Sequence, residues 1–506
     1  MKGVYKHKAK DLQRKAIYES IANLKEKGGH GFFCEMGTGK TLMALYASMH
    51  MHTKGYLDTV IIISPKSLQN NWLQEINKHL NIEIRPFIFS SNMFTTKRKA
   101  FMFESTKKKK LKIYLINLEI FSVKNKARET FLSTLKEDKT ILILDESSKI
   151  KGYNANRSKA LVALASKFKY KLILTGTEIS NSILDLFMQM LFLEQDFWGR
   201  LSKKYFYFRA YYAMLETKYT AGGRTYKKVV GFQKINELTG KINPWISRIR
   251  KKDMLDLPDK IFDVIYLDMP SETEDFYFTL KEKLKAEYED KKLTVVNKSV
   301  LFIKFRMICA GCFKDNENKT YHFKENPKLQ FVLDEAEDHN KKFLVWSSFV
   351  KEIEQYLFSL EKNKIKARSF YGGLVEKKRQ ANIEEFKNAS ECRALIINPQ
   401  AGAFGLNLQF CDLAYYTTLP TSVDQFLQSQ DRLHRMGQKN HPQYKILLYR
   451  NTVDENIFIH LMELTCLIED FKNGVINDTV YTHEKEKKSL MNIFKNGTIE
   501  DFFKLI

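Results

Sequence analysis

A glycine-rich segment near the amino terminus has the residue types of a phosphate-binding loop. The stretch GFFCEMGTGKT at 31–41 follows a short apolar run and precedes a helical pattern. Glycines let backbone N–H groups turn inward around phosphates, a lysine reaches the β and γ phosphates, and a hydroxyl at the helix start can bind Mg²⁺. The strict pattern has one more glycine six residues before the lysine, where this chain has Cys34. The residues that match are Gly37, Gly39, Lys40 and Thr41.

A second segment offers two adjacent carboxylates. ILILDESSKIKG at 141–152 has four apolar residues that end in Asp145 and Glu146. Open α/β sheets bind ligands at the carboxyl ends of their strands. There Asp145 would hold Mg²⁺, and Glu146 would orient or deprotonate an attacking water. An acidic helix cap after a strand is the simpler alternative, but the phosphate loop upstream favours an ATP site that uses Mg²⁺.

Continuous apolar runs predict the elements that position these groups. Runs of this kind, rather than alternating ones, indicate strands buried on both faces, hence parallel sheets covered by helices. Helical periodicity at 67–80 and 375–388 fits the intervening stretches. The sequence therefore predicts two α/β lobes. The runs lie at 59–64, 112–117, 140–145 and 171–175 in the first part, and at 342–347, 394–398, 413–417 and 444–449 in the last.

The stretch between the lobes has a different pattern, rich in aromatic and charged residues and mainly helical. It contains one predicted β-hairpin at 217–232, with Gly222 and Gly223 at the turn. The tail is helical at first and then polar and lysine-rich. We therefore expect a first lobe at 1–195, a helical insertion with the hairpin at 196–325, a second lobe at 326–460 and a helical tail at 461–506.

The composition and charge of the chain indicate which kinds of partner it can bind. Lys and Arg total 83 against 59 Asp and Glu, a net charge of +24, which favours a polyanion because neutralised phosphates release counterions; a lysine-rich surface that only confers solubility is the alternative. No apolar run reaches the roughly 18 residues that span a bilayer, and no secretory signal is recognisable. Cys309 and Cys312 have no second pair to complete a zinc site. These features predict a reducing, intracellular compartment and no membrane partner.

In this context the chain resembles the Swi/Snf-type branch of superfamily 2, whose motifs it follows in order. The most specific match is QSQDRLHRMGQ at 428–438, with Gln, Asp, Arg, His, Arg, Gly and Gln at fixed offsets. That branch often lacks the leading glycine of the phosphate loop too. The other matching segments are Leu12-Gln13, EMGTGKT (35–41), 61–75 with Trp72 and Glu75, DESSKIKG (145–152), LTGTEISNSILDLFMQMLFL (174–193), 248–260, 343–349, 371–386 and 397–420.

The resemblance implies a fold and an ATP site. It implies two RecA-like lobes in tandem and a DNA helicase or translocase driven by ATP hydrolysis. Gln13 would read adenine, and Arg432 and Arg435 would reach across to ATP bound on the first lobe. The implied catalytic set is Lys40, Asp145, Glu146, Arg432 and Arg435. The implied ATP-binding set is Gln13, Glu35, Met36, Gly37, Thr38, Gly39, Lys40, Thr41 and Gly405, with Thr41 and Asp145 on the metal.

The chain departs from the family pattern at two places. Ser147-Ser148 stands where Ala-His or Gly-His is usual, so Ser148 replaces a histidine that resembles a relay between the nucleotide and the coupling motif at 174–193. A serine hydroxyl can form hydrogen bonds but carries no positive charge. Glu178 replaces the usual proline after LTGT. Neither change removes a group that hydrolysis needs, so we expect an active ATPase.

The resemblance also implies tracking on duplex DNA through its phosphates, with little base specificity and strong salt dependence. The hairpin places cations and an aromatic side chain where they could grip a backbone or stack on a base, although a purely structural hairpin is the alternative. The expected contacts are Lys66, Ser67, Thr175, Thr177, Gly402 and Asn407, with Arg224, Tyr226 and Lys227 in the hairpin.

Three functions remain open at this stage. The first is a helicase that remodels forks and junctions in replication, repair or recombination. The second is a duplex translocase that displaces bound proteins. The third is a nucleic-acid-binding protein with a vestigial ATP site, against which the intact catalytic set argues. Almost no sequence flanks the motifs, which favours the cytoplasm of a bacterium, including a virus-infected one, over a eukaryotic nucleus.

Overall fold

The computed structural model describes two compact units. The first comprises 1–217, 227–256 and 474–482, and the second 218–226, 257–473 and 483–506. Each unit contains a parallel sheet, which confirms the predicted α/β fold with two lobes. The described residues are 8–80, 86–89, 111–124, 126–133, 135–180, 182–219, 225–289, 295–315, 317, 319–402, 406–473 and 481–482.

The first unit has a seven-stranded sheet with the strand order β3-β4-β2-β5-β6-β1-β9. Its strand pairs are parallel, for example Asp145 opposite Leu174 between β5 and β6. All four predicted strands of the first lobe are present. The strands are β1 (Gly29–Cys34), β2 (Thr59–Ser64), β3 (Phe87–Ile88), β4 (Lys112–Asn117), β5 (Thr140–Asp145), β6 (Tyr170–Thr175) and β9 (Ile246–Ile249).

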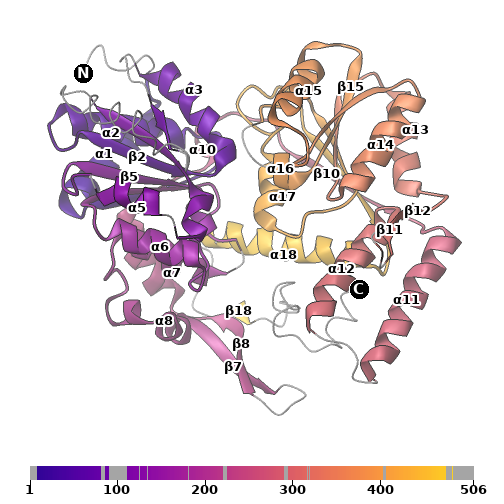
Figure 1. Ribbon diagram of the computed structural model, residues 1–506, viewed down its shortest axis with the longest axis horizontal. Helices are drawn as coiled ribbons and strands as arrows, with labels where there is room; N and C mark the ends of the chain where they lie inside the picture. Colours follow the sequence, from indigo (N-terminus) through magenta and orange to yellow (C-terminus); the bar gives the residue numbers. More distant parts are fainter. Residues whose placement is uncertain are drawn as a thin grey trace. The chain divides into compact units, whose positions relative to one another are not determined.

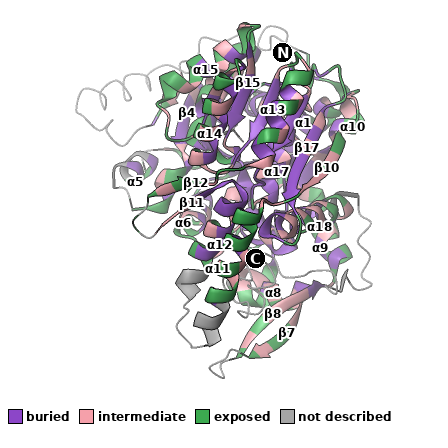
Figure 2. Ribbon diagram, turned by 90° about the vertical axis from the view of Figure 1, so that its right-hand side faces the viewer, coloured by how far each residue is buried: buried purple, intermediate pink, exposed green. Residues whose placement is uncertain are grey.

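Helices enclose this sheet (Figure 1), and its central strands are buried along their whole length. Figure 2 shows buried strands in purple between helices that expose green residues to solvent. This explains the continuous apolar runs, because a strand covered on both faces has no solvent side to alternate with. The helices are α1 (Asp11–Glu26), α2 (Lys40–Thr53), α3 (Gln69–His79), α5 (Lys126–Ser133), α6 (Asn156–Ala165), α7 (Leu186–Leu193), α8 (Tyr205–Tyr212), α9 (Ile235–Ile242) and α10 (Lys251–Met254).

The second unit has a six-stranded parallel sheet with the order β10-β17-β16-β13-β15-β14. Val345 and Tyr415 face a core filled by α13 (Pro327–Asp338) and α14 (Val350–Lys362). The alternate residue Tyr416 packs against Phe426 of α17 (Val423–Gln430). The strands are β10 (Ile261–Leu267), β13 (Phe343–Trp346), β14 (Lys366–Phe370), β15 (Cys392–Ile397), β16 (Leu413–Tyr416) and β17 (Gln443–Tyr449); the other long helices are α15 (Glu376–Asn388) and α18 (Val453–Asn473).

The segment expected as an insertion at 196–325 is divided between the units. β9 adds to the first sheet beside β1, whereas β10 adds to the second sheet beside β17. Backbone hydrogen bonding thus assigns the first part of the segment to the first sheet and the later part to the second sheet. The boundaries expected at 195 and 325 therefore differ from those of the two units. The remaining helices of the segment are α11 (Ser271–Glu289) and α12 (Val295–Cys309), which belong to the second unit.

The predicted hairpin is present as β7 (Ala213–Tyr219) and β8 (Thr225–Phe232), neighbours in a small sheet. The predicted Gly222-Gly223 turn lies outside the described residues.

Among the helices that the structure describes, none combines the length and apolar character needed to cross a membrane.

Candidate functional site

The phosphate loop joins β1 to α2, as its residues predict. Gly37 and Gly39 have φ angles of 84° and 90°, which a residue with a Cβ rarely adopts. A Cβ on Gly39 would lie 2.5 Å from Gln13 Nε2. Gln13 itself donates to the Thr38 carbonyl oxygen at 2.8 Å and accepts from the Lys10 N–H at 2.9 Å. The predicted adenine-reading glutamine therefore also braces the loop.

Lys40 lies at the start of α2, with its ammonium at the loop. Its Nζ donates to the carbonyl oxygens of Cys34 at 2.8 Å and Glu35 at 3.3 Å. Both acceptors are neutral, so the positive charge stays available to an anion. A Cβ on Gly176 would come 3.4 Å from Lys40 Nζ and 3.1 Å from Met36 Cγ. The coupling motif therefore lies directly against the phosphate loop.

Glu35 has a structural role beside its predicted ATP contact. Its Oε2 accepts a hydrogen bond from the Lys251 N–H at 2.8 Å, at the first residue of α10. Its own N–H donates to the Ile249 carbonyl oxygen at 3.0 Å. A carboxylate near a helix amino terminus is stabilised by the unpaired N–H groups and the dipole there. Glu35 thus ties the phosphate loop to β9 and α10.

Asp145 ends β5 and is buried, as is Glu146. Asp145 Oδ2 accepts from Trp72 Nε1 at 2.8 Å, and Oδ1 accepts from the Glu146 N–H at 3.0 Å. Burial raises the pKa of Asp145, while the Trp72 hydrogen bond and the Lys40 charge oppose that rise. Glu146 has a φ of 54°, a left-handed conformation that stores backbone strain in a residue other than glycine.

The residues around the loop suit Mg²⁺ bound together with phosphates. In the described part of the chain no group of three or more His, Cys, Asp and Glu side chains could hold a metal. Mg²⁺ is commonly held by one or two carboxylates with substrate phosphates. Asp145 and the half-buried Thr41, in the first turn of α2, supply a donor set of that kind.

The predicted nucleic-acid contacts fall into two groups. Lys66 and Ser67 are exposed on the short helix Lys66–Leu68 after β2, and Lys227 is exposed on β8. Thr175 and Thr177 are buried, and the Thr175 hydroxyl donates to the Thr177 carbonyl oxygen at 2.7 Å. Thr175 therefore shapes the coupling loop and presents no hydroxyl to a ligand. Arg224 lies outside the described residues.

Arg432 and Arg435 follow α17 in the second unit. Each donates through Nη1 to the Leu406 carbonyl oxygen at 3.3 Å, and Arg435 also bonds to Asn407 Oδ1. Arg432 is buried, whereas Asn407 is exposed. The two arginines thus share one backbone acceptor, in the matching segment 397–420. Gly402 ends the short helix α16 (Pro399–Gly402), and Gly405 lies outside the described residues.

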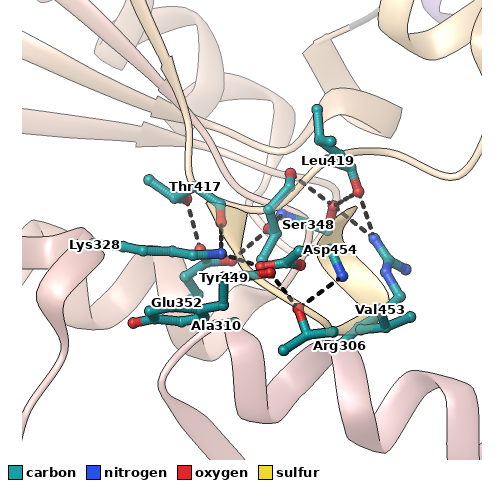
Figure 3. A network of polar contacts seen from close by, with 12 residues as sticks. Arg306, Ala310, Lys328, Ser348, Glu352, Thr417, Leu419, Tyr449, Val453 and Asp454 are labelled. Atoms are coloured by element: carbon teal, nitrogen blue, oxygen red, sulfur yellow. Dashed lines mark hydrogen bonds and ion pairs between the residues drawn. The ribbon is translucent and has the colours of Figure 1, made fainter. Parts of the chain in front are cut away.

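A buried polar network in the second unit was not predicted from the sequence. Lys328 donates to the Thr417 carbonyl oxygen at 2.9 Å and pairs with Asp454, both side chains being buried (Figure 3). Arg306 of α12 donates to the Leu419 carbonyl oxygen at 2.7 Å and to Ser348 Oγ at 3.1 Å. No motif marks these residues. Arg306, a charged side chain in the largely apolar helix α12, is the one signal that could have pointed to this network.

Glu352 completes this network. Its carboxylate accepts hydrogen bonds from the hydroxyls of Ser347, Thr417 and Thr418, at 2.5, 2.6 and 2.7 Å. Burial raises its pKa, and these three hydrogen bonds oppose the rise. Burial also lowers the pKa of Arg306 to about 10. The network fixes the carboxyl ends of β13 and β16, the edge where sheets of this kind bind ligands.

Together these features define a phosphate-loop protein with two parallel-sheet lobes. Comparison with known families gives the finer assignment. Residues 18–314 match the SNF2-related domain, and residues 327–437 match the helicase conserved C-terminal domain. The first match alone covers more than half of the chain. The chain therefore belongs to the SNF2-related family of helicase-type ATPases.

Individual relatives are distant and longer. An uncharacterised ATP-dependent helicase of Mycoplasma genitalium is 28% identical over 84% of this chain and 38% of its own length. The DNA annealing helicase and endonuclease of Bos taurus is 24% identical over 83% of this chain and 37% of its own. This chain thus spans well under half the length of these relatives. The SWI2/SNF2 ATPase core of Sulfolobus solfataricus in complex with double-stranded DNA aligns over 100% of this chain and 98% of its own, at 22% identity and a TM-score of 0.41.

Proposed function

We propose that this chain is an ATP-hydrolysing DNA motor that remodels or unwinds branched DNA. The observation that carries the proposal is the contact between the phosphate loop and the coupling motif, where Gly176 lies against Lys40 and Met36. Loss or movement of the γ phosphate would therefore shift Lys40 and Met36 against the loop that follows β6. Family membership supports the same conclusion.

The roles in hydrolysis follow from the residue chemistry. Lys40 and the loop N–H groups bind the phosphates. Mg²⁺, when bound by Thr41 and Asp145, would neutralise phosphate charge. Glu146 orients the attacking water and accepts its proton. Arg432 and Arg435 stabilise the charge on the transferring phosphoryl group, a contribution that can reach orders of magnitude in rate.

The proposed contacts to DNA are made by exposed cationic and polar side chains. Lys66 and Ser67 are available to a phosphate on the first unit, and the net charge of +24 favours a polyanion. Tyr226 and Lys227 on β8 carry an aromatic ring and a cation toward the hairpin end. One relative is named a DNA annealing helicase, which supports a branched substrate and a role in replication, repair or recombination. The Mycoplasma relatives support a bacterial cytoplasm.

A duplex translocase that displaces proteins without opening base pairs is the second candidate. A CHD3-type chromatin-remodeling factor of Arabidopsis thaliana is 24% identical over 85% of this chain, so the same core also occurs in proteins of that name.

Strand separation distinguishes the two candidates. Labelled forked, four-way-junction and plain duplex DNA are each incubated with the protein and ATP, and the released strands are resolved on native gels. We expect release from forks and junctions, and loss of that release in a Tyr226→Ala/Lys227→Ala variant whose DNA-stimulated hydrolysis continues. Hydrolysis stimulated equally by plain duplex, without release from any substrate, would favour the translocase.

A further inference from the structure

Gln189 is the one polar residue of α7, whose sequence is LFMQMLFL. Its side chain is completely buried. An amide transferred from water to an apolar interior costs free energy unless its hydrogen bonds are replaced. The partners of Gln189 therefore show what this residue does.

Those partners are the two motifs that a motor must connect. Gln189 Oε1 accepts from the Ser147 hydroxyl at 2.7 Å. Gln189 Nε2 donates to the carbonyl oxygens of Glu178 at 2.9 Å and Asp185 at 3.1 Å. Ser147 directly follows the water-activating Glu146, and Glu178 lies in the coupling motif. One fully bonded amide thus joins the carboxylate motif to the coupling motif.

The connection continues from Glu178 to β9. The buried Glu178 carboxylate accepts from Arg248 Nε at 3.1 Å and from Nη2 at 2.9 Å. Arg248 lies opposite Phe33 of β1, the strand that leads into the phosphate loop. A bidentate pair of this kind fixes both distance and direction. The path Ser147–Gln189–Glu178–Arg248 therefore crosses the unit beside the nucleotide site.

Ser147 and Glu178, two residues of this path, stand at positions where the chain departs from the family pattern. Alanine or glycine in place of Ser147 offers no hydroxyl to Gln189, and proline in place of Glu178 offers no carboxylate to Arg248. Ser148, which stands at the position of the usual histidine, makes no hydrogen bond with the described residues through its buried hydroxyl. The polar link in this chain therefore passes through Ser147 and not through Ser148.

We propose that Gln189 is a positioning residue that transmits the state of the carboxylate motif to the coupling motif, in place of the absent histidine. The inference rests on the proposed function, because it assumes that this coupling serves work on DNA. Glu146 is held in a strained left-handed conformation, so a shift of Glu146 toward bound nucleotide displaces Ser147. The Ser147 hydrogen bond then moves the Gln189 amide against the Glu178 carbonyl group.

The first experiment needs no DNA. Amide hydrogen exchange over 174–180 is followed with and without ADP–beryllium fluoride in wild type, Gln189→Leu and Ser147→Ala. We expect nucleotide to slow exchange in this segment of wild type, and the slowing to fall by about fivefold in either variant, which corresponds to one hydrogen bond of about 1 kcal/mol. Met190→Leu, an equally buried change on the same helix, is the matched control and should behave as wild type.

A double-mutant cycle gives the second test. In the Ser147→Ala/Gln189→Leu variant the loss should not exceed that of Gln189→Leu alone, because both changes remove the same hydrogen bond. The small Ser147→Ala truncation keeps the test valid if Gln189→Leu fails to fold. Nucleotide protection that is equal to wild type in Ser147→Ala, or strictly additive losses, would overturn the inference.

DNA-stimulated hydrolysis separates this inference from the proposed function. Stimulation should fall several-fold in Gln189→Leu while the KM for ATP stays within about twofold, since the residue does not touch the nucleotide loop. If DNA fails to stimulate wild type while nucleotide protection still depends on Gln189, the proposed function is wrong and the link stands. If KM rises and kcat is unchanged, the positioning role is wrong.

Discussion

Trp72 Nε1 donates a hydrogen bond to Asp145 Oδ2 at a distance of 2.8 Å, and both side chains are buried. Trp72 lies on α3, after β2, whereas Asp145 ends β5, so the bond joins two motifs that are 73 residues apart. A neutral N–H that points at a buried carboxylate favours the ionised form without adding a competing cation. Trp72 can therefore influence the proposed Mg²⁺ site without being one of its ligands.

Trp72→Phe should shift the pH dependence of hydrolysis. The Trp72 bond lowers the pKa of Asp145, which burial raises, so its removal raises that pKa further. The Asp145 carboxylate, which we propose binds Mg²⁺, is then protonated at a higher pH than in wild type. The acid limb of kcat should therefore move to higher pH by about one unit, as expected for the loss of a hydrogen bond to a charged group. Steady-state rates from pH 5 to 9 measure this. Trp198→Phe removes another buried indole donor, to the Phe187 carbonyl oxygen, and should leave the limb in place; equal profiles for all three proteins would contradict the role of Trp72.

Lys40→Ala and Glu146→Gln should each abolish hydrolysis for different reasons. The first removes the cation that reaches the phosphates, and the second removes the base but keeps the size of the side chain. Glu146→Gln should therefore still bind a fluorescent ATP analogue, while Lys40→Ala binds it weakly. Phosphate release and equilibrium binding measure the two properties. Turnover that persists in either variant would disprove the assignment of the site.

Lys66→Ala should lower the salt dependence of DNA binding. Each phosphate contact that releases a counterion contributes about 0.9 to the slope of log K against log salt concentration on duplex DNA. Removing one exposed lysine contact should therefore reduce that slope by about 1. Lys78 is also exposed but pairs with Glu75 at 4.0 Å on α3, so Lys78→Ala is the control. Fluorescence anisotropy at several salt concentrations gives the slopes, and identical slopes for Lys66→Ala and wild type would remove Lys66 from the interface.

Lys328→Met should destabilise the second unit by about 3–5 kcal/mol. It leaves the buried Asp454 carboxylate without its direct ion-pair partner, and breaking a buried pair by removing one partner costs that much. Urea unfolding measures the free energy. Lys351 pairs with Glu354 on the surface, where a pair is worth about 0–1 kcal/mol, so Lys351→Met is the matched control. Lys328→Met/Asp454→Asn should recover part of the loss; equal stability of Lys328→Met and its control would mean that the pair is not desolvated in solution.

Much of the fold could be predicted because the central strands are buried on both faces. A run such as TILILD at 140–145 has no solvent side, and its length separates it from a helix. β10 escaped prediction because IFDVIYL is only partly buried, and β9 because ISRI is too short to show a pattern. Their pairing with different sheets divides the predicted insertion, and long-range pairing of this kind leaves no local signal.

Some residues of the site could likewise be predicted from the sequence, whereas others could not. Spacing predicts roles for Lys40, Asp145 and Glu146, because phosphate and metal chemistry demands particular residue types at fixed offsets. Gln189 lies within the segment 174–193, but its role cannot be predicted from sequence, since one amide in an apolar helix does not reveal its partners. The role of the Thr175 hydroxyl also could not be foreseen, because it donates to a backbone carbonyl group only two residues further along the chain.

Whether DNA stimulates this ATPase is decided by ATP hydrolysis of wild type without DNA and with single-stranded, plain duplex and forked DNA, at low and moderate salt. We expect a several-fold rise in kcat with DNA, largest on forked DNA and reduced by salt, and background turnover by Lys40→Ala under every condition. A rate that no DNA changes at low salt, or equal rates for wild type and Lys40→Ala, would show that this chain is not a DNA-stimulated ATPase with the proposed site.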